Sequence, residues 1–135
     1  MPSLPHIVVV DDSENDRAVL KGFLDRKYLI TEVDNGGDCL SLLTNSSSIP
    51  DLVILDLHMP GFSGDDLLNY LRLKPSLRNM PILFVTAISS MDRDSYLPHL
   101  SGEHFLHKPV IHSILIDKVN YLLTNNFSSN NRLSL

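Results

Sequence analysis

The sequence predicts an α/β fold built on a five-stranded, doubly wound parallel sheet. Five short apolar runs recur along the chain, and each is separated from the next by a segment long enough for a helix. Strands that alternate with helices form βαβ units, in which the strands lie parallel. The runs at 7–10 and 52–55 are continuously apolar, which is typical of central strands covered on both faces.

The first strand is predicted over 7–10, and a helix follows it. Residues 13–16 (Ser-Glu-Asn-Asp) resemble a capping box, in which the serine and the fourth residue satisfy free N–H groups at the start of a helix. The apolar residues that follow at helical spacing are Val19, Leu20, Phe23 and Leu24. The second strand is predicted over 28–33 and the third over 52–55.

In the second half of the chain, Asp65 and Asp66 favour a helix N-terminus, and Pro75 ends that helix. Its inward stripe consists of Leu67, Leu68 and Leu71. Strands are predicted over 82–85 and, more weakly, over 105–106. Between them Pro98 predicts a short or distorted helix within 89–100. The last helix has the most regular amphipathic stripe, formed by Ile111, Ile114, Leu115, Val119 and Leu122.

The length of 135 residues fits one domain, which we place at residues 4–124, followed by a polar tail or linker stub at 125–135. The formal charge of −5 argues against direct nucleic-acid binding. Cys39 is the only cysteine, which is compatible with a reducing compartment, and no stretch approaches a membrane span or a signal sequence. We therefore expect a cytoplasmic protein without membrane contact.

Polar residues follow four of the predicted strands. Asp11 and Asp12 end the first strand, Asp56 the third, Thr86 the fourth and Lys108 the fifth. The carboxyl ends of parallel strands meet at one edge, so these side chains are expected to share a crevice there. Their mutual repulsion, about 4 kcal/mol for each close pair of carboxylates, calls for a cation, and Mg²⁺ suits such oxygen ligands. An aspartate beside a cation, a lysine and a hydroxyl can accept a phosphoryl group, giving an aspartyl phosphate.

With these residues in place, the chain resembles a receiver domain of bacterial two-component response regulators, of the kind found in stand-alone, chemotaxis-type regulators. The motifs that carry the resemblance, from about residue 4 to 124, are Asp11-Asp12, Asp56-Leu57-His58-Met59-Pro60 with Gly64, Thr86-Ala87 and Lys108-Pro109. The resemblance implies the flavodoxin-like receiver fold with strand order 2-1-3-4-5.

The resemblance also implies a role for each matching residue. Asp56 corresponds to the phosphoacceptor, and Mg²⁺ is held by Asp12, Asp56 and the backbone carbonyl of His58, with Asp11 acting largely through water. Thr86 and Lys108 contact the phosphoryl group, and the Lys108-Pro109 bond is expected to be cis. Phe105 corresponds to the aromatic switch residue, which would report phosphorylation to the face made by the fourth helix, the fifth strand and the fifth helix.

Four positions depart from the family pattern. His58 and Ile88 occupy positions that tune the lifetime of the phosphoryl group in the family, so that lifetime stays open. Phe105 lacks a hydroxyl for a switch hydrogen bond. Pro98 lies in the fourth helix, which belongs to the usual output face. Plain structural roles also exist: Asp11, Asp12 and Ser13 can cap a helix, and Phe105 can serve as core.

The sequence therefore predicts a phosphoryl-accepting switch, a signalling domain that catalyses only its own phosphorylation and dephosphorylation. The expected partners are a histidine kinase or histidine phosphotransfer protein and an unidentified downstream effector. One alternative is a receiver that no longer needs phosphorylation and serves as a docking scaffold; another is a receiver excised from a hybrid kinase or multidomain regulator. A haloacid-dehalogenase-like phosphatase would need a second aspartate two residues after the nucleophile, where Ser13 and His58 stand.

Overall fold

A computed structural model describes residues 4–45, 49–61, 64–87 and 104–133 of the chain. The described strands form one parallel sheet in the order β2-β1-β3-β4-β5, as predicted. The strands are β1 (His6–Val10), β2 (Leu29–Val33), β3 (Leu52–Leu55), β4 (Ile82–Thr86) and β5 (Phe105–His107). Each boundary lies within about one residue of the apolar run that predicted it.

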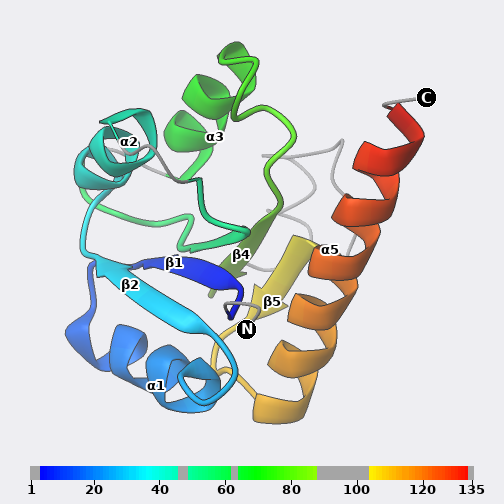
Figure 1. The fold of residues 1–135 in the computed structure, drawn as a ribbon. Helices are drawn as coiled ribbons and strands as arrows, with labels where there is room; N and C mark the ends of the chain where they lie inside the picture. The colour runs from blue at the N-terminus through cyan, green and yellow to red at the C-terminus, as the bar shows by residue number, and fades with distance from the viewer. Residues whose placement is uncertain (1–3, 46–48, 62–63, 88–103, 134–135) are drawn as a thin grey trace.

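Four helices cover the sheet in the described part of the chain: α1 (Glu14–Leu24), α2 (Gly36–Asn45), α3 (Gly64–Leu73) and α5 (His112–Leu133). Figure 1 shows α2 and α3 on one side of the sheet and α1 and α5 on the other. The helix predicted within 89–100, with Pro98, lies outside the described residues. None of the helices among the described residues is both long enough and apolar enough to cross a membrane.

Two separate hydrophobic cores result, one on each face of the sheet. Val8, Val10 and Leu55 face α2 and α3, whereas Ile7 and Ile54 face α1 and α5. Alternate residues of one strand therefore enter opposite cores, which is why these strands are apolar throughout. The prediction that 7–10 and 52–55 are interior strands is confirmed.

The predicted helix stripes are confirmed for α3 and only in part for α1 and α5. Leu67, Leu68 and Leu71 of α3 are buried, as are Leu20 and Leu24 of α1 and Leu115, Val119 and Leu122 of α5. Val19, Ile111 and Ile114 are exposed, which corrects the prediction. Val19 and Ile114 each precede a buried leucine by one residue, and a step of one residue turns a side chain about 100° around the helix. Ile111 lies before the first residue of α5.

The last helix is longer than the sequence predicted. Helix α5 continues to Leu133 and so includes most of the residues assigned to a polar tail. The division into a domain at 4–124 and a tail at 125–135 stays a prediction.

Candidate functional site

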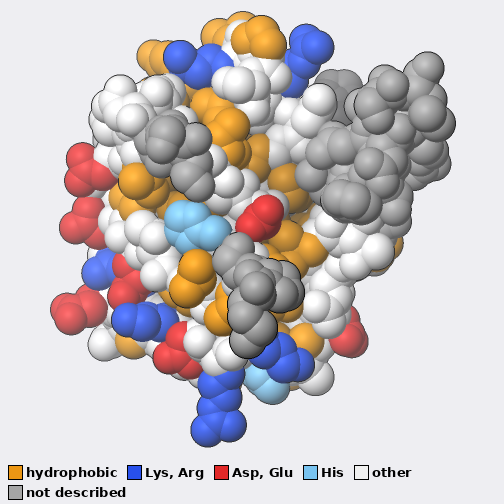
Figure 2. Space-filling view, in the orientation of Figure 1, with side chains coloured by type: hydrophobic (Ala, Val, Ile, Leu, Met, Phe, Trp, Pro, Cys, Tyr) orange, Lys and Arg blue, Asp and Glu red, His pale blue; other side chains and the backbone are white. Residues whose placement is uncertain are grey.

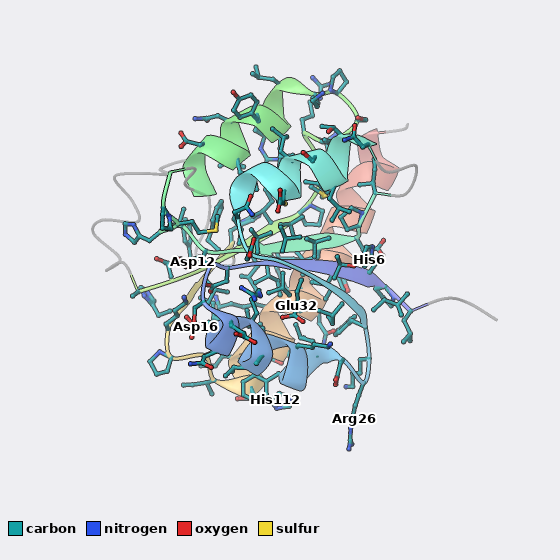
Figure 3. The ribbon with its side chains drawn as sticks, turned by 90° about the vertical axis from the view of Figure 1, so that its left-hand side faces the viewer. His6, Asp12, Asp16, Arg26, Glu32 and His112 are labelled. Atoms are coloured by element: carbon teal, nitrogen blue, oxygen red, sulfur yellow. The ribbon has the colours of Figure 1, made fainter. Side chains whose placement is uncertain are left out.

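The acidic residues of the predicted site lie where β1 and β3 end. The ladder of backbone hydrogen bonds extends to them: the Asp11 N–H donates to Val33 O at 3.1 Å, and the Asp56 N–H donates to Val10 O at 3.0 Å. Carboxylate oxygens of Asp11, Asp12 and Asp56 all lie within 4.8 Å of one another. Figure 3 shows Asp12 at one end of the sheet and His6, at the start of β1, at the other. The structure therefore brings the predicted acid cluster together.

The three carboxylates differ in their exposure to solvent. Asp11 and Asp56 are buried, with exposed fractions of 1% and 6%, whereas Asp12 is exposed. One oxygen of Asp56, Oδ1, accepts a hydrogen bond from the His58 N–H at 3.0 Å. Burial raises the pKa of Asp56 and outweighs the opposing effects of this hydrogen bond and of Lys108. A cation held between these carboxylates would favour the ionised form of Asp56.

Lys108 brings a positive charge into the acid cluster from the end of β5. Its Nζ lies 2.8 Å from Asp16 Oδ2, 3.0 Å from Asp11 Oδ2 and 3.4 Å from Asp56 Oδ2. Burial alone would lower the pKa of Lys108, but the hydrogen bonds to Asp16 and Asp11 outweigh it and raise that pKa above its ordinary value. Lys108 is therefore charged throughout the physiological pH range.

The start of α1 explains how Asp16 reaches Lys108. Ser13 is the N-cap, and its Oγ accepts a hydrogen bond from the Asp16 N–H at 3.2 Å, as the capping-box pattern predicts. The return bond differs from the pattern, because the Ser13 N–H donates to Asp11 Oδ1 at 2.9 Å. The Asp16 carboxylate is therefore available to Lys108. Asp11 uses one oxygen for the helix cap and the other for Lys108.

Arg17 contacts the loop between β1 and α1, which carries Asp11 and Asp12. Its Nη1 donates to the backbone carbonyl of Asp11 at 2.7 Å, and its Nε lies 3.4 Å from Glu32 Oε1. Lys21 pairs with the other oxygen of Glu32 at 3.8 Å, so two cations of α1 meet one carboxylate of β2. Side chains of both charge signs are interspersed over α1 and β2 in Figure 2. Arg17 links the acidic loop to a neighbouring strand.

The remaining predicted residues lie in the same region. Thr86 ends β4 and is fully buried, and its carbonyl accepts a hydrogen bond from the Lys108 N–H at 3.0 Å. The Lys108–Pro109 peptide bond is cis, as the resemblance implied. Phe105 is buried and stacks on Phe84 with ring centroids 5.5 Å apart, so it belongs to the core in this structure.

Two positions that we singled out in the sequence, Ile88 and Pro98, lie outside the described residues. Two others were missed: Asp16 and Arg17 contact the site but were absent from the predicted set. The sequence could have indicated Asp16, because a residue in the first turn of α1 lies near the edge of the sheet where β1 ends. It was assigned only to the capping box of that helix.

The donor set defines what the site can do chemically. Carboxylate oxygens are hard ligands of the kind that bind Mg²⁺ and Ca²⁺, and the exposed Asp12 leaves one side open to water and to a phosphate group. Buried Asp56 offers an oxygen beside the Lys108 ammonium. This arrangement suits a reaction in which anionic oxygens approach Asp56.

The fold agrees with the comparison to known proteins. The family model of the response regulator receiver domain matches residues 7–120, and the chain belongs to this family. Among curated relatives, the two-component response regulator ORR11 of Oryza sativa subsp. indica is 34% identical over 107 residues, covering 78% of this chain and 72% of the relative. The regulator ORR5 of Oryza sativa subsp. japonica is 33% identical over 107 residues, covering 78% and 79%.

Two solved structures of similar fold are receiver domains. The signal receiver domain of a signal transduction histidine kinase from Syntrophus aciditrophicus superposes with a TM-score of 0.79 at 29% identity, covering 90% of this chain and 91% of that one. The signal receiver domain of a LuxO repressor protein from Vibrio parahaemolyticus gives 0.78 at 28% identity, covering 94% and 95%. The strand order and the family, both predicted from the sequence, are thus confirmed.

Proposed function

We propose that this receiver domain is a phosphorylation switch in which Asp56 accepts a phosphoryl group from a phosphohistidine. The donor is a histidine kinase or a histidine phosphotransfer protein, as membership of the two-component family implies. The observation that carries the proposal is the convergence of Asp11, Asp12, Asp56 and Lys108, which come from separate parts of the chain, at one edge of the sheet.

Mg²⁺ is the proposed cofactor of this transfer. Asp12, Asp56 and the His58 carbonyl are its proposed direct ligands, and Asp11 is proposed to act largely through water. The fit rests on three carboxylates whose oxygens lie within 4.8 Å, one of them exposed to solvent. When bound, the cation would neutralise phosphoryl oxygens and so lower the electrostatic barrier to their approach.

The proposed transfer is a displacement at phosphorus. A carboxylate oxygen of Asp56 forms a bond to phosphorus while the bond from phosphorus to the histidine nitrogen breaks, and the electron pair of that bond stays on the nitrogen. Lys108, within 3.4 Å of Asp56 Oδ2, balances the charge of the incoming oxygens. Hydrolysis later returns Asp56 to a carboxylate and releases inorganic phosphate. The domain thus acts as a signalling switch, with catalysis limited to its own modification.

The proposed output is a change of the face formed by the fourth helix, β5 and α5, of which β5 and α5 lie within the described residues. Thr86 ends β4 next to β5, where its register partner is His107. Phe105 lies one strand away from Phe84 and stacks on it. A phosphoryl group that draws the Thr86 hydroxyl toward Asp56 would alter the packing around Phe105, and an effector protein would read the change.

The test is phosphorylation with a small donor. The whole chain is incubated with acetyl phosphate and Mg²⁺ and analysed by mass spectrometry of the intact protein. Wild type should gain one phosphoryl group that hydroxylamine removes, Asp56→Asn should gain none, and excess chelator should suppress the reaction. Asp34→Asn is the matched control, because Asp34 directly follows β2 at the same edge of the sheet and lies outside the acid cluster.

Unmodified wild-type protein under these conditions would overturn the proposal and favour the docking scaffold, which needs no phosphorylation. Modification that persists in Asp56→Asn would show that another residue is the acceptor.

A further inference from the structure

Lys108 is surrounded by three carboxylates, and the one that lies nearest to it is outside the acid cluster. The Nζ–Oδ2 distance is 2.8 Å for Asp16, against 3.0 Å for Asp11 and 3.4 Å for Asp56. Asp16 comes from the first turn of α1, and its side chain is 43% exposed. Figure 3 shows Asp16 close to Asp12, at the same end of the sheet.

The position of the Asp16 carboxylate follows from the unusual cap of α1. In a capping box this side chain would bond back to the N-cap N–H. Here Asp11 accepts that hydrogen bond, so the Asp16 carboxylate has no capping function and pairs with Lys108. Loss of the Asp16 carboxylate should therefore leave the helix cap intact, since the cap uses the Ser13 hydroxyl and the Asp16 backbone N–H.

Building on the proposed function, we propose that Asp16 is a positioning residue that competes with the phosphoryl group for the Lys108 ammonium. An ammonium has three N–H donors, and three carboxylates already engage it. A phosphoryl group approaching Asp56 needs one of these donors. Asp16 holds Lys108 on the α1 side and so slows the transfer.

The expected size of the effect follows from the exposure of Asp16. A partly exposed ion pair is worth little, so its removal should change the rate by about two- to fivefold rather than by orders of magnitude. We expect Asp16→Asn to be phosphorylated by acetyl phosphate about two- to fivefold faster than wild type at saturating Mg²⁺. The measurement is the initial rate of modification by mass spectrometry of the intact chain.

The matched control is Asp38→Asn. Asp38 occupies the corresponding position in the first turn of α2, where its backbone N–H donates to Asn35 Oδ1, and its carboxylate accepts from Asn35. Among the described interactions, Asp38 makes no contact with Lys108. The phosphorylation rate of Asp38→Asn should therefore match that of wild type. This control separates the loss of a first-turn charge from the loss of the Lys108 partner.

A double-mutant cycle tests whether Asp16 acts through Lys108. In a Lys108→Gln background, Asp16→Asn should change the rate less than about twofold, because no ammonium remains to be released. An equal acceleration in both backgrounds would mean that Asp16 repels the anionic donor directly, and the inference would be wrong. An Asp16→Asn rate equal to wild type would also overturn it, while leaving the proposed function intact. Failure of wild type itself to be phosphorylated would instead count against the proposed function.

Discussion

At the scale of single residues, burial and charge oppose each other most directly at Asp56. Its side chain is buried beside two other carboxylates, and burial raises its pKa despite the nearby Lys108 ammonium. The folded chain therefore binds a proton at Asp56 more readily than the unfolded chain does. Stability gained from this group is fully present below its unfolded pKa and is lost as pH rises through the folded pKa. At neutral pH the ionised Asp56 lowers the stability of the fold.

Replacement of Asp56 by asparagine should therefore stabilise the protein. Without divalent cation at pH 7, Asp56→Asn is expected to unfold at a temperature several degrees above wild type, because it removes a buried charge without changing the size of the side chain. The difference should shrink as pH falls through the raised Asp56 pKa, where wild type becomes protonated. The measurement is thermal unfolding by circular dichroism between neutral and acidic pH, with Asp34→Asn as the exposed control. A variant less stable than wild type at pH 7 would contradict the prediction.

At the scale of secondary-structure elements, α1 carries more of the site than its sequence indicated. Its N-cap holds Asp11, its first turn supplies Asp16 to Lys108, and Arg17 contacts the Asp11 carbonyl. The same helix contributes Leu20 and Leu24 to one core. A change in the stability of α1 therefore bears on both the fold and the acid cluster.

Gly22 tests the stability of α1, and Gly61, between β3 and α3, serves as a contrasting position. Gly22 is exposed in the last turn of α1, and nothing lies within 4 Å of the position that a Cβ would take. Gly22→Ala should raise the free energy of unfolding by about 0.5–1 kcal/mol, since alanine loses less backbone entropy in a helix. Gly61 also has open space but has a φ of +78°, where Gly61→Ala should lower the free energy of unfolding by about 1–2 kcal/mol. Urea denaturation measures the free energy of unfolding of both variants. A change in the same direction for both would contradict this prediction.

The elements also show what the sequence could and could not predict about the site. Asp11, Asp12, Asp56 and Lys108 were predicted together because each follows an apolar strand, and parallel strands end at one edge. The contact between Asp16 and Lys108 joins residues 92 positions apart, and no local pattern records it. Asp16 already had a local explanation as part of a helix cap, so its longer-range partner emerged only from the folded structure.

At the scale of the whole molecule, periodicity predicted the layers, whereas the family resemblance supplied the strand order. Apolar runs separated by helices require a sheet covered on both faces, and the two cores confirm this. Nothing in the periodicity says that β1 lies between β2 and β3, because that depends on which way each helix crosses the sheet. The exposure of Ile114 was missed for a related reason. An apolar stripe locates the buried side of a helix, but the packing of α5 decides how far that side extends.

The division into two cores predicts how mutations combine. Ile7 and Ile82 are fully buried on opposite faces of the sheet, on strands separated by β3. Ile7→Val and Ile82→Val should each lower the free energy of unfolding by about 0.5–1.5 kcal/mol. The double variant should equal their sum to within about 0.5 kcal/mol, because the two side chains lie in different hydrophobic cores. Ile7→Val combined with Ile54→Val, in the same core, should depart from additivity by more than that. Urea denaturation of all variants makes the comparison, and strong coupling between Ile7 and Ile82 would mean that the sheet transmits packing changes between its faces.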